Sequence, residues 1–137
     1  MSANYPFLMD VSLGLIYVFL GGGIGSVLRF SIERWTGKAF PSSFPYSTLT
    51  VNLIGSFFIG VLFVCLDRLS LPSQYRLFIG TGLLGGFTTF STFSLENALL
   101  IRNASYQAAV VNIATSILLG LSFVILGIYF ASLVIKK

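Results

Sequence analysis

Four predominantly apolar runs cover most of the chain, and their lengths determine its fold class. They lie at about residues 11–30, 48–66, 74–101 and 106–134. A transmembrane helix needs about 20 predominantly apolar residues, and backbone polar groups in lipid must be satisfied within the segment. The sequence therefore predicts an all-α integral membrane protein with four transmembrane helices. Since the runs use most of the length, we expect residues 1–137 to form a single transmembrane domain.

The composition agrees with a membrane protein and argues against several other classes. The chain has eight Lys and Arg, four Asp and Glu, and a mean hydropathy of +0.93. It has no histidine, its single cysteine is Cys65, and no spacing suggests a nucleophile beside a base. We therefore expect that the chain is not an enzyme. The basic residues are scattered among the runs, which indicates anchoring at the membrane surface rather than nucleic-acid binding.

The third run contains a stretch that is a poor uniform helix. Residues 80–96 read Gly-Thr-Gly-Leu-Leu-Gly-Gly-Phe-Thr-Thr-Phe-Ser-Thr-Phe-Ser-Leu-Glu. Each Gly in a helix interior costs about 1 kcal/mol against Ala, and Ser and Thr hydroxyls compete for backbone hydrogen bonds. These residues predict a helix broken mid-membrane, with Gly85 to Thr89 as the break, where carbonyls and helix ends can hold an ion. A glycine-rich helix-packing face is an equally good interpretation of the spacing.

Polar or small residues recur at a spacing of four in the second and fourth runs. One stripe comprises Thr48, Asn52, Ser56 and Gly60, and the other comprises Ala108, Asn112, Ser116 and Gly120. Residues four apart share one helix face. An Asn at membrane depth either bonds a neighbouring helix, which is the more frequent case, or lines a ligand path. Arg29, near the end of the first run, is either a snorkelling anchor or a positive charge at the mouth of an anion path.

The Lys and Arg residues are evenly divided between the two sides of a four-span arrangement. One side has Arg68, Arg76, Lys136 and Lys137, and the other has Arg29, Arg34, Lys38 and Arg102. The positive-inside rule orients a protein by the imbalance between its loops, so this sequence does not specify one orientation. We therefore expect insertion both ways and an antiparallel dual-topology homodimer. A dimer also answers a size problem, because four helices alone barely enclose a pore.

Three motifs in the first three runs are distinctive. They are Gly-Gly-Ile-Gly-Ser-Val-Leu-Arg at 22–29, Thr-Val-Asn-Leu-Ile-Gly-Ser-Phe at 50–57, and Gly-Gly-Phe-Thr-Thr-Phe-Ser-Thr-Phe-Ser at 85–94. With these motifs, and over nearly its whole length, the chain resembles the Fluc (CrcB) family of fluoride channels. The resemblance implies a multi-pass channel of a bacterial inner or plasma membrane that lets cytoplasmic fluoride leave passively, which reduces fluoride toxicity.

The resemblance also implies roles for particular residues. Family members form antiparallel dual-topology dimers with two fluoride pathways. A structural sodium ion at the dimer centre is held by backbone carbonyls, which by motif position are those of Gly85 and Thr88. Arg29 would make the vestibule electropositive. The fluoride pathway would comprise Phe90, Phe93, Asn52, Ser91, Thr92, Asn112 and Ser116. Amide and hydroxyl donors can replace the water around fluoride, and the edge of an aromatic ring is positive.

Two other membrane functions are compatible with parts of the sequence. A small dual-topology, proton-coupled exporter of cationic compounds needs a carboxylate at depth, and Glu96 is the only acid well inside an apolar run. The substitution Glu96→Gln distinguishes this exporter from a fluoride channel, since it should abolish coupled export but spare a fluoride pore. A non-transporting scaffold would explain the small-residue stripes but not the polar groups that accompany Phe90 and Phe93.

Overall fold

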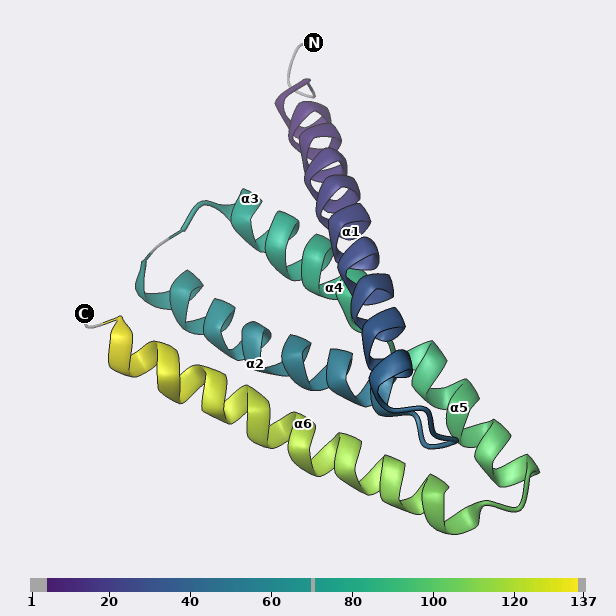
Figure 1. Cartoon of the computed structure of the whole chain (residues 1–137). Coiled ribbons are helices and arrows are strands. Elements are labelled where there is room, and N and C mark those ends of the chain that lie inside the picture. Colours follow the sequence, from purple (N-terminus) through teal and green to yellow (C-terminus); the bar gives the residue numbers. More distant parts are fainter. Residues whose placement is uncertain (1–4, 70, 136–137) are drawn as a thin grey trace.

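The chain is helical over most of its length. The computed structural model describes residues 5–69 and 71–135 (Figure 1). The helices are α1 (Tyr5–Ala39), α2 (Tyr46–Arg68), α3 (Ser73–Tyr75), the π-helix η1 (Arg76–Leu84), α4 (Gly85–Phe87), α5 (Phe90–Arg102) and α6 (Tyr106–Val134). Elements α3, η1 and α4 follow one another directly and, with α5, occupy the third predicted span. The prediction of an all-α fold is confirmed.

Three of these helices are individually long and apolar enough to cross a membrane. They are Val11–Ala39 within α1, all of α2, and all of α6. The third predicted span is divided by an interruption between α4 and α5, so neither part of it is that long.

The first helix extends further than the sequence predicted. We expected the first span to end near residue 30, but α1 continues to Ala39. Tertiary packing supports this extension, because Thr36 is buried and its hydroxyl donates to Ser47 Oγ at 2.8 Å and to the carbonyl of Ile32 at 2.7 Å. The helix ends just before Pro41, as the steric restriction on residues preceding proline requires. The connection to α2 is therefore confined to residues 40–45.

Helices α2 and α6 run side by side along their length (Figure 1). Glycines allow the close approach at one end of the pair. A Cβ atom added at Gly60 would overlap the carbonyl oxygen of Val124, and one added at Gly127 would overlap the carbonyl oxygen of Phe57. Small residues at a membrane helix interface let two backbones approach in this way.

Helix α1 crosses the π-helix η1 and α4 (Figure 1). A Cβ atom at Gly21 would overlap the carbonyl oxygen of Phe78, and one at Gly25 would overlap that of Leu83. On the facing side, Gly86 lies directly against the backbone of Gly22. The packing interpretation of these glycines is therefore confirmed, and it explains why glycines of the third span lie in helix although each one disfavours it.

Candidate functional site

The third span is interrupted at two consecutive threonines. Thr88 has φ −81° and ψ 160°, and Thr89 has φ −150° and ψ 123°, so both residues are extended. Thr89 is the N-cap of α5, and its Oγ1 accepts a hydrogen bond from the backbone N–H of Thr92 at 3.2 Å. Within the predicted break, Gly85 to Phe87 are helical. The prediction of a broken helix is confirmed, but within the predicted break only Thr88 and Thr89 are non-helical.

The side-chain amide of Asn52, on α2, forms hydrogen bonds with the backbone at the interruption. Its Nδ2 donates to the carbonyl of Thr89 at 3.1 Å, and its Oδ1 accepts from the N–H of Thr89 at 2.9 Å. Both polar groups of the extended residue are thereby satisfied, which membrane depth requires. The sequence left two roles open for Asn52, and the structure shows that it bonds a neighbouring segment. Since an amide has two N–H donors, one N–H of Nδ2 is left for another partner.

The interruption also leaves the last carbonyls before α5 without their helical donors, among them those of Gly85 and Thr88. In a continuous helix, the N–H of Thr89 would bond the carbonyl of Gly85, and the N–H of Thr92 would bond that of Thr88. Here these N–H groups donate to Asn52 Oδ1 and Thr89 Oγ1 instead. Carbonyl oxygens are suitable ligands for a hard cation. The carbonyls of Gly85 and Thr88, which the family resemblance implies as sodium ligands, are among those without helical donors and suit a hard cation.

A cavity of about 460 Å³ lies beside the interruption. Its walls come from α2, η1, α4, α5 and α6. They include the predicted site residues Asn52, Gly85, Thr88, Phe90, Phe93 and Ser116. Ser116 Oγ is buried and has no hydrogen-bond partner among the described residues. The cavity thus combines a free hydroxyl and an available amide N–H with aromatic rings.

The two phenylalanines of α5 differ in exposure. Their ring centroids are 5.7 Å apart, with an interplanar angle of 39°. Phe93 is partly buried in the cavity wall, whereas Phe90 is 79% exposed. Phe90 therefore projects from the single chain immediately beside the cavity.

A second cavity, of about 520 Å³, lies between α1, α2 and α5. Arg29 and Thr92 line it, and so do Thr48 and Glu96. Thr48 Oγ1 donates to Glu96 Oε1 at 2.6 Å, while Glu96 Oε2 is buried without a partner among the described residues. Arg29 thus lies away from the cavity beside the break, in a polar chamber where it contributes positive charge.

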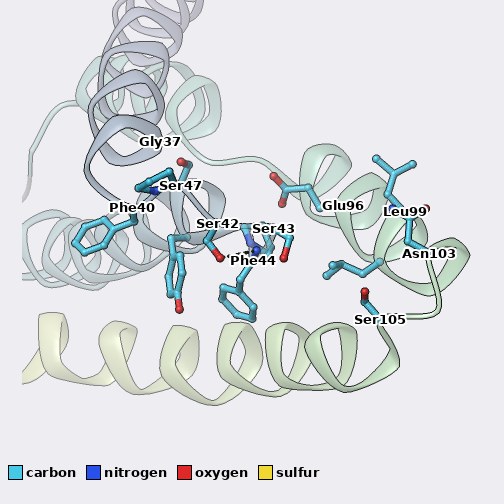
Figure 2. A pocket seen from close by; sticks show the side chains of 14 residues that line it. Gly37, Phe40, Ser42, Ser43, Phe44, Ser47, Glu96, Leu99, Asn103 and Ser105 are labelled. Atoms are coloured by element: carbon cyan, nitrogen blue, oxygen red, sulfur yellow. Dashed lines mark hydrogen bonds between the residues drawn. The ribbon is translucent and has the colours of Figure 1, made fainter.

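A third cavity, of about 490 Å³, opens under the connection between α1 and α2. Figure 2 shows Glu96 and Ser105 on one side of it and the serines of the connection, Ser42 and Ser43, on the other. Ser47 and Glu96 line both this cavity and the second one. Polar side chains therefore continue from the connection to the chamber of Arg29.

Two predicted pathway residues lie outside these cavities. Asn112 is 1% exposed, and its Nδ2 donates to Asn97 Oδ1 at 3.2 Å. Ser91 is exposed, and its Oγ lies 3.4 Å from Thr89 Oγ1. In the single chain, Asn112 therefore serves the contact between α5 and α6, and Ser91 lies next to the N-cap.

Sequence reasoning missed two residues that organise the site. Thr89 caps α5, and a Thr immediately before a helical run is a recognised start signal. Asn97 donates from Nδ2 to the carbonyl of Phe93 at 2.7 Å. Its spacing of four from Phe93 was visible in the sequence, but its partner Asn112 on another helix was not.

Comparison with known proteins agrees with these motifs. A family model described as CrcB-like protein, Camphor Resistance (CrcB), matches residues 16–128. A protein named fluoride-specific ion channel FluC from Campylobacter fetus subsp. fetus (strain 82-40) is 43% identical over 84% of this chain and 91% of the relative. Proteins of the same name from Parabacteroides distasonis and Roseiflexus sp. (strain RS-1) are 44% and 47% identical, over 83% and 84% of this chain and 91% and 94% of the relatives. The chain is therefore a multi-pass membrane protein that belongs to the CrcB family.

Proposed function

We propose that the chain is a fluoride-selective ion channel that lets cytoplasmic fluoride leave the cell passively. The observation that carries this proposal is the cavity beside the break, where Asn52, Ser116 and the two phenylalanines meet. The names of the relatives support fluoride as the ion. The family assignment agrees with the expectation that the chain is not an enzyme, and it favours the channel over the cation exporter.

The donors at the cavity suit a small, strongly hydrated anion. A selective path must replace the water around fluoride with N–H and O–H groups, because carbonyls and carboxylates only accept hydrogen bonds. Ser116 Oγ is buried without a partner among the described residues, and Asn52 retains one N–H. Phe90 and Phe93 offer ring edges, which carry partial positive charge. Ser91 and Thr92 are further hydroxyl donors on the same helix. Arg29 would supply positive charge at the vestibule, where Glu33 and Glu96 line the same cavity.

Passive movement is sufficient for detoxification. Hydrogen fluoride crosses membranes as a neutral weak acid and dissociates at the higher internal pH. The trapped anion then leaves down its gradient, helped by a negative-inside potential, which contributes about 2.3 kcal/mol per charge per 100 mV. This mechanism uses no energy-coupling group in the chain.

We further propose that two copies associate as an antiparallel, dual-topology homodimer with two fluoride pathways. The exposure of Phe90 and Gly85 beside the cavity supports this, since a second copy would cover them. The even division of basic residues supports insertion both ways, although Lys136 and Lys137 lie outside the described residues. A cysteine introduced at Ser42 should be labelled from both sides of intact cells. Labelling from one side alone would contradict dual topology.

The proposed dimer centre includes a structural sodium ion held by the carbonyls of Gly85 and Thr88. The support is the loss of their helical donors to Asn52 and to Thr89 Oγ1. A sodium ion bound there would supply positive charge that balances these oxygens. The chain's own contribution is the extended conformation at Thr88 and Thr89, which removes the backbone donors that these two oxygens would have in a continuous helix.

Anion efflux from liposomes tests the function directly. Purified protein is reconstituted into vesicles, and fluoride and chloride release are compared with ion-selective electrodes. We expect rapid fluoride release with negligible chloride release. Folded protein that releases neither anion would overturn the channel proposal.

A further inference from the structure

Two buried asparagines connect α6 to the backbone of Phe93. Asn112 on α6 is 1% exposed and Asn97 on α5 is 6% exposed. Asn112 Nδ2 donates to Asn97 Oδ1 at 3.2 Å, and Asn97 Nδ2 donates to the carbonyl of Phe93 at 2.7 Å. A buried amide is costly unless it is hydrogen-bonded. Each asparagine therefore holds the other in this arrangement.

The bond from Asn97 acts on the turn of α5 that faces the cavity. In an α-helix the carbonyl of Phe93 accepts the backbone N–H of Asn97, so the side chain of Asn97 adds a second donor to the same oxygen. Side-chain bonds to the carbonyl four residues earlier can bend a helix locally. Phe93 lines the cavity, so this bond acts on the backbone of a residue whose ring forms part of the cavity wall.

Helix α5 depends on a small number of such bonds. It diverges from the other helices and lies near the beginning of α6 (Figure 1). Asn52 holds its N-terminal end through Thr89, and Thr48 bonds Glu96 further along. Asn112 adds a hydrogen bond from α6. Without this hydrogen bond, this part of α5 would contact α6 through apolar side chains, whose packing is less directional.

We propose that Asn97 and Asn112 are positioning residues for Phe93, and that they set the rate and selectivity of the fluoride pathway without contacting the ion. Neither residue lines the cavity, whereas Phe93 does. The inference rests on the proposed channel function. It gives Asn112, which the sequence placed among the pathway residues, a role that acts through Asn97.

The test compares ion release by Asn112→Leu, Asn97→Leu and the double variant Asn97→Leu/Asn112→Leu with the full-length wild type in liposomes. Release is measured per folded protein, after size-exclusion chromatography. Each single variant should lower fluoride release by about tenfold, which corresponds to one net hydrogen bond of about 1.4 kcal/mol. Each should also lower the ratio of fluoride to chloride release. The control Ser122→Ala removes an exposed hydroxyl that bonds the carbonyl of Leu118 within α6 and should leave both values unchanged.

The double variant separates positioning from simple packing. It leaves no buried amide unpaired, and replacing both partners by apolar groups is often nearly neutral for stability. If the single variants do not fold, the double variant therefore serves as the test of the proposal. A folded double variant with a lowered selectivity ratio supports the proposal, and one with the wild-type rate and ratio overturns it. Wild-type protein that releases no fluoride would instead contradict the proposed function itself.

Discussion

The side-chain amide of Asn52 pairs with the backbone of Thr89 through two hydrogen bonds, of 3.1 Å to its carbonyl and 2.9 Å from its N–H. This pairing replaces, for one residue, the bonds that a continuous helix would supply. It also places a polar side chain of α2 at the cavity beside the break. One residue thus stabilises the interruption and retains an N–H that, in the proposed channel, would bind the ion.

Substituting Asn52 tests its proposed place in the fluoride pathway. Asn52→Asp keeps an acceptor for the N–H of Thr89 but removes the donor and adds a negative charge. We expect fluoride release to fall by about 100-fold, since hydrogen bonds to charged groups contribute about 1.5–3 kcal/mol. Liposome efflux measures this. Ser122→Ala, which deletes an exposed hydroxyl bonded to the carbonyl of Leu118, is the control. Wild-type rates in Asn52→Asp would remove Asn52 from the pathway.

The aromatic rings of α5 are open to direct test. Phe90→Ile and Phe93→Ile keep apolar bulk but remove the ring edges. Each should cut fluoride release by about tenfold, because aromatic contacts of this type contribute about 0.5–1.5 kcal/mol. Dimer assembly, followed by size-exclusion chromatography, should be intact. Phe19→Ile is a matched control, since Phe19 on α1 is as exposed as Phe90, at 79%. Unchanged release in both α5 variants would refute the role of the ring edges.

Close packing of α2 and α6 makes one glycine far more sensitive than another on the same helix. Gly127→Ala places a methyl group against the carbonyl of Phe57, whereas the nearest atom to a Cβ at Gly120 is Ser56 Oγ at 3.8 Å. Overpacking of this kind costs about 1–3 kcal/mol. Thermal unfolding in detergent should show a lower midpoint for Gly127→Ala and little change for Gly120→Ala. Equal midpoints would contradict the close approach of the two backbones.

Removal of sodium tests the carbonyl site at Gly85 and Thr88. Protein dialysed exhaustively against a bulky organic cation should lose fluoride release, and sodium chloride should restore it. The physical reason is that two carbonyl oxygens without donors repel each other and those of a second copy unless a cation lies between them. Full release in the absence of sodium would show that the channel does not need the ion.

The sequence by itself determined the fold class and most of the helix positions. In lipid, the backbone polar groups must be hydrogen-bonded within the protein. Four apolar runs long enough to span a membrane therefore predict four transmembrane helices. The same constraint exposed the third span as interrupted, because its threonines and serines compete with the helix ladder. The distinctive motifs also pointed to several residues that line the cavity, including Asn52, Phe90 and Phe93.

Only the tertiary structure decided where the interruption lies and which polar groups meet. Gly82 and Gly86, which precede Thr88, are helical and pack against the backbone of α1, which local propensity does not encode. The extension of α1 to Ala39 depends on a hydrogen bond between Thr36 and Ser47. Asn97 and Asn112 are fifteen positions apart and meet only because α5 and α6 fold against each other. Such partners depend on contacts between helices, and no spacing along one helix predicts them.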